Sequence, residues 1–175
     1  YYELGCIYEK GLGVEIDHSK AKEYFLISCQ ADHETCFHLG FMYENGIDVK
    51  QNYKRAKFYY KISSKYNNSD AYIALGNLYE KGYGCKRDYN KAKKYYEISS
   101  NLKNPKAFLK LGDFYAKGIS NDTNYFMAKY YYELSAKQNN SKALFSLGVI
   151  YANGLGVEQN YKIAKKYYEL AAEQN

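Results

Sequence analysis

Residues 143–157 have the sequence ALFSLGVIYANGLGV, and this stretch decides the fold because its spacing recurs along the whole chain. The Leu-Gly dipeptide at its centre appears five times, with steps of 35, 36, 36 and 36 residues. A fixed period of this length is typical of stacked repeat architectures. The five dipeptides are Leu4-Gly5, Leu39-Gly40, Leu75-Gly76, Leu111-Gly112 and Leu147-Gly148.

Each repeat carries signals for two helices. Asp32, Asn68, Asn104 and Asn140 precede the first helices, and their short polar side chains can accept hydrogen bonds from free N–H groups of a helix N-terminus. A tyrosine four residues after each Leu and a glycine seven after it predict the helix end, since glycine tolerates the left-handed conformation there. Thirteen residues after the Leu, an Asn or Asp again predicts a helix start, at Asp17, Asn52, Asp88, Asn124 and Asn160.

The second helix of each repeat carries an alanine followed by a pair of aromatic residues, as in Ala164 with Tyr167 and Tyr168. Small and large side chains alternate as closely packed helices require. The glycine of each Leu-Gly lies inside a helix at a cost of about 1 kcal/mol against alanine. We therefore expect the backbone of a neighbouring helix to approach closely at these glycines, which are Gly5, Gly40, Gly76, Gly112 and Gly148.

These patterns predict an all-α fold, an α-solenoid built as a right-handed superhelix of antiparallel helix pairs. About five repeats of 36 residues would form one domain over residues 1–175. The expected boundaries are residues 1–31 for a repeat truncated at its N-terminus, then 32–67, 68–103, 104–139 and 140–175.

The spacing resembles the Sel-one-like repeat, a relative of the tetratricopeptide repeat, whose pattern residues 143–157 match at every position. Thr35 in place of the leading alanine, and Asp48 and Ser120 in place of the second turn glycine, depart from that pattern. The resemblance implies an adaptor or scaffold that binds protein partners.

Composition removes several other classes of protein. No apolar run approaches the roughly 20 residues of a membrane span, so none is expected in this segment. The net charge of +6 is modest. A lysine follows the alanine in the second helix of each repeat, and these lysines could form a phosphate-binding ridge. Acidic residues interrupt that side of the helices, so we expect a solvated outer face and no bound nucleic acid. These lysines are Lys22, Lys57, Lys93, Lys129 and Lys165.

A solenoid offers a concave surface lined by its first helices. Taking 100° per residue, positions two before and two, five and six after each Leu point away from the core. We expect a peptide or helix of a partner to bind there, along a surface whose charge changes from acidic to neutral or basic. The alternative is that the position two before each Leu is partly buried and the rest is merely solvated. The predicted binding residues are Phe37, Phe41, Glu44, Ile73, Asn77, Glu80, Leu109, Asp113, Lys117, Phe145 and Val149.

Four cysteines are too few for a disulfide scaffold. Cys29 and Cys36 could form one disulfide or remain as buried thiols. With His33 and His38 they also have metal-like spacing, but their places at a helix end and a helix start argue against convergence on zinc. Secreted cysteine-rich members of the family that the chain resembles bridge the same two positions in every repeat, and some are reported to bind or hydrolyse β-lactams. Here only one repeat has the pair.

Catalysis is not expected within this segment. Its three histidines, His18, His33 and His38, all lie in the first forty residues, and no nucleophile, base and orienting group are brought together by the pattern. No cofactor site is indicated either. The alternatives to an adaptor are a secreted protein with β-lactam-binding or hydrolase-like activity, and a structural array that associates with itself. The sequence leaves the compartment open between the cytoplasm and the endoplasmic-reticulum lumen or secretion.

Overall fold

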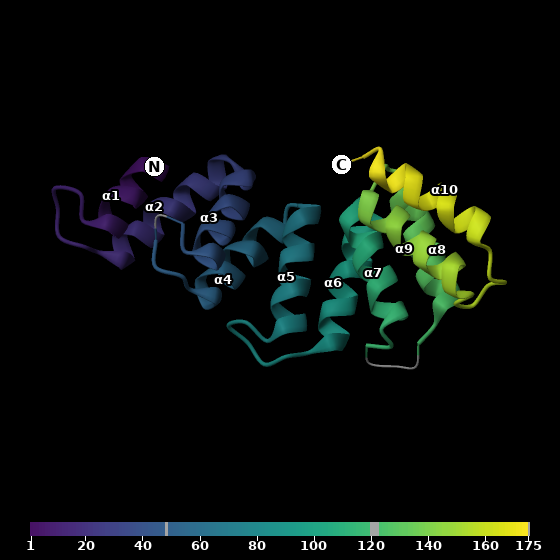
Figure 1. The fold of residues 1–175 in the computed structure, drawn as a ribbon. Coiled ribbons are helices and arrows are strands. Elements are labelled where there is room, and N and C mark those ends of the chain that lie inside the picture. The colour runs from purple at the N-terminus through teal and green to yellow at the C-terminus, as the bar shows by residue number, and fades with distance from the viewer. Residues whose placement is uncertain (48, 120–122, 175) are drawn as a thin grey trace. The chain divides into compact units, whose positions relative to one another are not determined.

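The computed structural model describes residues 1–47, 49–119 and 123–174, and in these ranges the chain forms ten α-helices and no strand (Figure 1). Asp48 and Ser120, where the sequence departs from the turn pattern, lie outside the described residues. No helix in the described ranges combines the length and apolar character needed to cross a bilayer. The helices are α1 (Tyr2–Lys10), α2 (His18–Ala31), α3 (His33–Asn45), α4 (Tyr53–Ser64), α5 (Ser69–Lys81), α6 (Tyr89–Asn101), α7 (Pro105–Ala116), α8 (Tyr125–Ala136), α9 (Ser141–Asn153) and α10 (Tyr161–Ala172).

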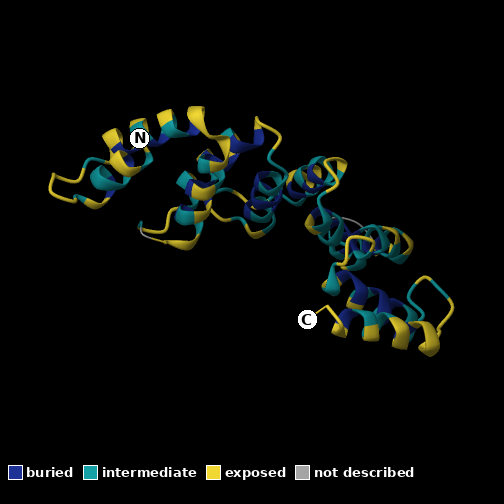
Figure 2. Cartoon of the chain, turned by 90° about the horizontal axis from the view of Figure 1, so that it is seen from above, coloured by how far each residue is buried: buried dark blue, intermediate teal, exposed yellow. Residues whose placement is uncertain are grey.

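The helices fall into two compact units. Unit 1, Tyr1–Asp88, contains α1 to α5, and unit 2, Tyr89–Asn175, contains α6 to α10. In unit 1 each helix packs on the next one along the chain, and the same holds in unit 2. Buried positions lie on the sides of the helices that face their neighbours, while exposed positions lie on the other sides (Figure 2). The all-α fold of tandem helix pairs is therefore confirmed.

Most of the capping residues that the sequence indicates begin their helices as expected. The Asn68 side chain accepts a hydrogen bond from the Ala71 N–H, and Asn140 accepts one from Ala143 in the same way. Pro105 occupies the first turn of α7, where its missing N–H has no partner to lose. Side-chain caps also begin α2, α3, α4, α7, α8 and α10, at Asp17, Asp32, Asn52, Asn104, Asn124 and Asn160.

Left-handed glycines end four of the first helices, at Gly11, Gly46, Gly82 and Gly154. At Gly82 φ is 75°, and its N–H donates to the Leu78 carbonyl. Helix α7 differs because it ends one residue earlier, with Lys117 as its C-cap in the right-handed region. Gly118 still has φ of 62°, so the turn that follows α7 retains the left-handed step.

The glycine inside each Leu-Gly contacts an aromatic ring of the second helix, not the backbone of a neighbouring helix as the sequence suggested. A methyl group added at Gly112 would lie 2.5 Å from the Tyr132 ring, and one at Gly40 would lie 2.5 Å from Tyr60. Gly5 and Gly148 contact Phe25 and Tyr168 in the same manner. A ring takes this place because the second helix carries its bulky aromatic residue directly opposite the glycine. A flat ring needs as much room there as a helix backbone would.

A second aromatic contact joins the two helices of each of these pairs. The tyrosine four residues after the Leu stacks on the first tyrosine of the aromatic pair, with ring centroids 5.6 to 5.8 Å apart and interplanar angles of 5° to 15°. Offset stacking at this separation stabilises beyond simple area burial. The stacked pairs are Tyr8 with Tyr24, Tyr43 with Tyr59, Tyr115 with Tyr131, and Tyr151 with Tyr167.

We expect Gly112→Ala to destabilise unit 2 by about 1–3 kcal/mol, because the added methyl group overpacks a buried ring. At an uncrowded position inside a helix, Gly→Ala would stabilise the protein by about 1 kcal/mol. The sign of the change in the free energy of unfolding therefore distinguishes a crowded glycine from an uncrowded one. Urea denaturation followed by circular dichroism measures the effect. In a Tyr132→Ala background, where the ring is absent, Gly112→Ala should be neutral or stabilising. A loss of the same size in both backgrounds would show that the ring is not the cause.

Candidate binding surface

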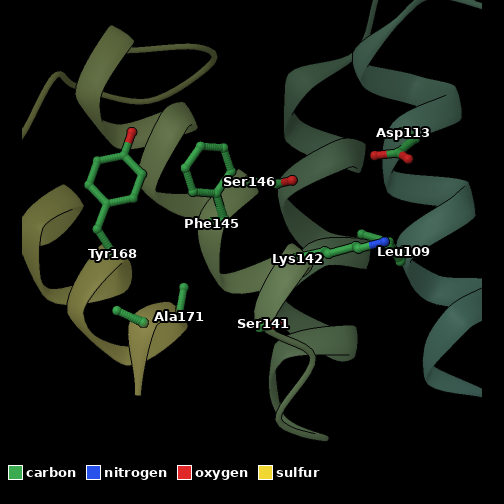
Figure 3. Close-up of a pocket in the computed structure, with 9 residues that line it drawn as sticks. Leu109, Asp113, Ser141, Lys142, Phe145, Ser146, Tyr168 and Ala171 are labelled. Atoms are coloured by element: carbon green, nitrogen blue, oxygen red, sulfur yellow. The ribbon is translucent and has the colours of Figure 1, made fainter. Parts of the chain in front are cut away.

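Unit 2 contains an open cavity of about 710 Å³ between α7, α9 and α10 (Figure 3). The Phe145 and Tyr168 rings lie together on one side of it, with centroids 5.4 Å apart and planes tilted by 45°. Lys142 and Asp113 add one charge of each sign to the wall. The lining residues are Leu109, Asp113, Ser141, Lys142, Phe145, Ser146, Tyr168, Ala171 and Ala172.

Local sequence explains why these side chains meet. The Asn140 cap begins α9 directly before Ser141, so Lys142 and Phe145 occupy its first two turns. Farther along α9, Gly148 lets the Tyr168 ring of α10 lie flat against the helix. Phe145 and Tyr168 are therefore neighbours for the same reason that α9 and α10 pack.

The apolar wall of the cavity is accessible. The Phe145 side chain retains 57% of its surface in water, although it lies beside a second ring and beside Leu109 and Ala171. A single exposed apolar residue is common on protein surfaces. An exposed apolar residue in a concave site that also contains a few polar groups is typical of a recognition surface.

The Asp113 carboxylate of α7 is held in place by a side chain of α8. The Tyr132 hydroxyl donates to Asp113 Oδ1 at 2.8 Å. Burial of Tyr132 raises the pKa of its hydroxyl above the ordinary range, and the neighbouring Asp113 charge raises it further. The hydroxyl therefore remains a proton donor to Asp113 at any physiological pH.

Unit 2 only partly matches the binding face expected from the sequence. Leu109, Asp113 and Phe145 line the cavity, whereas Lys117 and Val149 do not. Tyr168 was assigned to packing, and the residues from α10 were missed because the expectation considered first helices alone. The remaining lining residues missed by the prediction are Ser141, Lys142, Ser146, Ala171 and Ala172.

In unit 1 the expected binding residues differ in accessibility. Phe41 is exposed, and Phe37, Glu44, Asn77 and Glu80 are half-buried. Ile73 is only 7% exposed, so its side chain cannot offer much surface to a partner. Its burial agrees with the alternative interpretation of the position two before each Leu.

Glu44 has the same kind of anchor as Asp113. The Tyr60 hydroxyl donates to Glu44 Oε2 at 2.6 Å, and the Tyr60 ring lies 5.6 Å from that of Phe37. Burial raises the pKa of the Tyr60 hydroxyl well above its usual value, with the Glu44 carboxylate as a further cause. In both units, then, a buried tyrosine hydroxyl orients a carboxylate of the first helix.

A buried ion pair in unit 1 was not expected from the sequence. The Glu9 side chain is only 6% exposed, and its Oε1 accepts a hydrogen bond of 2.7 Å from Arg55 Nη1. Arg55 also donates to the Tyr43 hydroxyl at 2.9 Å, while His18 Nδ1 lies 3.1 Å from Glu9 Oε2. The contact joins α1 of the first helix pair to α4 of the second, and no spacing rule along the sequence would have found it.

Arg55→Ala should destabilise unit 1 by about 2 kcal/mol, because it leaves a buried carboxylate without its charged partner in a site that is partly solvated. Lys54→Ala, on the exposed neighbour, is the matched control and should change the free energy of unfolding by less than about 0.5 kcal/mol. Chemical denaturation of both variants gives the comparison. If Glu9→Gln does not reduce the cost of Arg55→Ala, the pair is not its source.

Cys29 and Cys36 form a disulfide between α2 and α3, with their Cα atoms 5.2 Å apart. Cys6 and Cys85 are thiols outside this disulfide. His33 Nδ1 lies 3.1 Å from the Cys29 carbonyl oxygen, and its ring stacks on Tyr66 with centroids 3.4 Å apart. Within the described ranges, no group of three or more His, Cys, Asp or Glu side chains is arranged to hold a metal ion.

Mass spectrometry tests the disulfide directly. Protein purified without reductant and alkylated in denaturant should gain two alkyl groups, at Cys6 and Cys85, since bridged sulfur atoms do not react. After reduction, all four cysteines should be alkylated. Four alkyl groups before reduction would mean that the purified chain carries thiols at Cys29 and Cys36.

Three of the five lysines that could form a ridge make ion pairs one helical turn away. Lys93, Lys129 and Lys165 lie 3.5 to 3.9 Å from Glu97, Glu133 and Glu169. Lys57 instead donates to the Gly84 carbonyl. Acidic residues on the same helices therefore partly balance this row of charge.

The repeated helix pairs, four of which place a Leu-Gly glycine against an aromatic ring, define an α-solenoid repeat protein. Five matches to the Sel1 repeat cover residues 1–33, 33–65, 69–104, 105–140 and 141–175. The chain belongs to the Sel1 repeat family, whose members are commonly protein-interaction scaffolds and generally non-catalytic.

Solved structures share the fold. A protective antigen of uropathogenic Escherichia coli strains, which displays an SLR fold, is 30% identical with a TM-score of 0.81 over 98% of this chain. A Sel1 repeat protein from Oxalobacter formigenes is also 30% identical, with a TM-score of 0.79, and the match covers 99% of this chain and 72% of that one. An immunity protein from Pseudomonas aeruginosa shares the fold at 23% identity and a TM-score of 0.62, over 99% of this chain and 67% of its own.

The present chain spans only 37% of the length of the Escherichia coli antigen. No curated protein matches the chain by sequence.

Proposed function

We propose that this chain is an interaction scaffold, and that the cavity of unit 2 between α7, α9 and α10 binds a peptide or helical segment of a partner protein. The observation that carries the proposal is the exposed Phe145 ring at the mouth of that cavity, beside Tyr168 and Leu109. Family membership supports the general role, and the cavity supplies a place where a partner could bind.

The composition of the wall favours a peptide. Apolar contacts come from Leu109, Phe145 and Ala171, and polar groups lie around them on Lys142 and Ser146. An apolar centre with polar groups at its margin is how a peptide side chain is bound while its backbone remains partly hydrated. The cavity is also open to solvent, which suits a segment of a partner protein better than an enclosed small molecule.

A display library of random short peptides provides the test, because no partner has to be known beforehand. We expect wild-type protein to enrich peptides, and Phe145→Ala to weaken the binding of the enriched peptides about 30-fold, as for loss of a central aromatic contact worth about 2 kcal/mol. Fluorescence polarisation of labelled peptides measures the affinities.

Phe126→Ala is the matched control. Phe126 is also in unit 2 and is 73% exposed, but it lies on α8 and does not line the cavity. It should leave peptide binding unchanged. Equal losses in the two variants, with both proteins folded by circular dichroism, would place the binding elsewhere. Failure of the library to enrich any peptide would count against the scaffold role of this surface.

A further inference from the structure

Where the ring that packs on a Leu-Gly glycine is a tyrosine, it also presents a hydroxyl group at its far end. In α3/α4 the Tyr60 hydroxyl donates to Glu44, and in α7/α8 the Tyr132 hydroxyl donates to Asp113. The two carboxylates come from different positions, five residues after Leu39 and two residues after Leu111. Both positions therefore place an acid within reach of the same hydroxyl.

The first helix pair provides a natural comparison, because its ring carries no hydroxyl. Phe25 replaces tyrosine there, and Glu9 occupies the position five residues after Leu4. Glu9 instead accepts its hydrogen bond from Arg55 of α4. The acid and the hydroxyl thus behave as partners, and the acid turns to another donor when the hydroxyl is missing.

The last helix pair has the hydroxyl without the acid. Tyr168 is a tyrosine like Tyr132, but Val149 and Ala152 occupy the positions two and five residues after Leu147. Among the residues that the structure describes, none forms a hydrogen bond with the Tyr168 hydroxyl. Its side chain borders the cavity, 5.4 Å from the exposed ring of Phe145 by centroid distance.

The cavity offers an acidic ligand one ammonium group and one hydroxyl donor. Lys142 is exposed and contributes an ammonium group to the wall. Asp113 is the acid among the lining residues, and the Tyr132 hydroxyl already donates to it. An incoming carboxylate would therefore meet the Lys142 ammonium group and the Tyr168 hydroxyl beside an apolar surface. The Asp113 charge, which the hydrogen bond from Tyr132 does not neutralise, offsets that of Lys142, so the preference for an acid rests on the Tyr168 hydroxyl.

We propose that the partner segment carries an Asp or Glu side chain whose carboxylate accepts the hydrogen bond of Tyr168, next to an apolar side chain that packs on Phe145. The partner then supplies the group that Asp113 supplies to Tyr132 within unit 2. This inference rests on the proposed function, since it names the chemistry that the same cavity selects.

The test uses pairs of peptides taken from those that the wild-type protein enriches, each with its Asp and Glu residues replaced by Asn and Gln in the second member. Wild-type protein should bind the acidic member about tenfold more tightly, as expected for a hydrogen bond to a charged acceptor. Tyr168→Phe keeps the ring against Gly148 and removes only the donor, so it should reduce this preference to about twofold or less.

A gain-of-acid variant makes the test sharper. Val149→Asp places a carboxylate where Asp113 lies in the preceding pair, so it should occupy Tyr168 from within and abolish the preference for acidic peptides. Val149→Ala is its control, because it alters the same position and leaves the hydroxyl open; the preference should persist. Fluorescence polarisation measures every affinity, and circular dichroism confirms that each variant is folded.

Two failures are distinguishable. If wild-type protein binds both members of each pair equally, or Tyr168→Phe retains the full preference, the acidic recognition is wrong while the peptide-binding role stands. If Phe145→Ala leaves all binding intact, the proposed cavity is wrong and the acidic inference falls with it.

Discussion

The structure depends on one contact, a flat aromatic ring of the second helix laid against a glycine of the first. A side chain at Gly40, Gly112 or Gly148 would collide with the ring, so the helices can approach this closely only because the glycine is bare. The glycine lowers the helix propensity of the first helix. The buried ring offsets this cost through the apolar area that it buries and its dispersion contacts. Stacked tyrosines a few residues away hold the same two helices at a second point. Together the two contacts fix both separation and rotation within a helix pair.

The same ring links packing to recognition. Once it lies on the glycine, its hydroxyl must emerge at the side of the first helix, where positions two and five residues after the Leu can meet it. Tyr60 and Tyr132 satisfy their hydroxyl groups with Glu44 and Asp113, and burial keeps those hydroxyls protonated. A structural contact therefore determines where a polar group appears on the surface that the first helices form.

Much of the fold follows from the sequence because its determinants are local. Caps such as Asn68 and Asn140, and left-handed glycines such as Gly82, act on backbone groups a few residues away, and spacing alone reveals them. The partner of the Leu-Gly glycine was misjudged because spacing does not say whether backbone or ring fills the space beside it. Ile73 was placed on an open face by a helical wheel, which treats one helix in isolation, and it is buried. The Glu9 and Arg55 pair joins residues 46 positions apart, beyond the reach of any repeat pattern.

The lining of the proposed binding cavity could be predicted only in part, for a related reason. The angular positions on the first helices identified Leu109, Asp113 and Phe145, but the cavity is completed by α10, which an expectation based on first helices left out. The informative signal was a difference between repeats. When every repeat uses the same residues to fold, those residues cannot distinguish one partner from another, so selectivity must arise where the repeats diverge. Here the repeats differ in the acid that lies beside the ring. Glu44 and Asp113 accept the hydrogen bond of that ring's hydroxyl, and Glu9 pairs with Arg55 instead. In the last pair, Val149 and Ala152 occupy the positions of the acid. We propose that a packing position that carries a hydroxyl becomes a recognition position when its internal acceptor is absent, without any change in the fold.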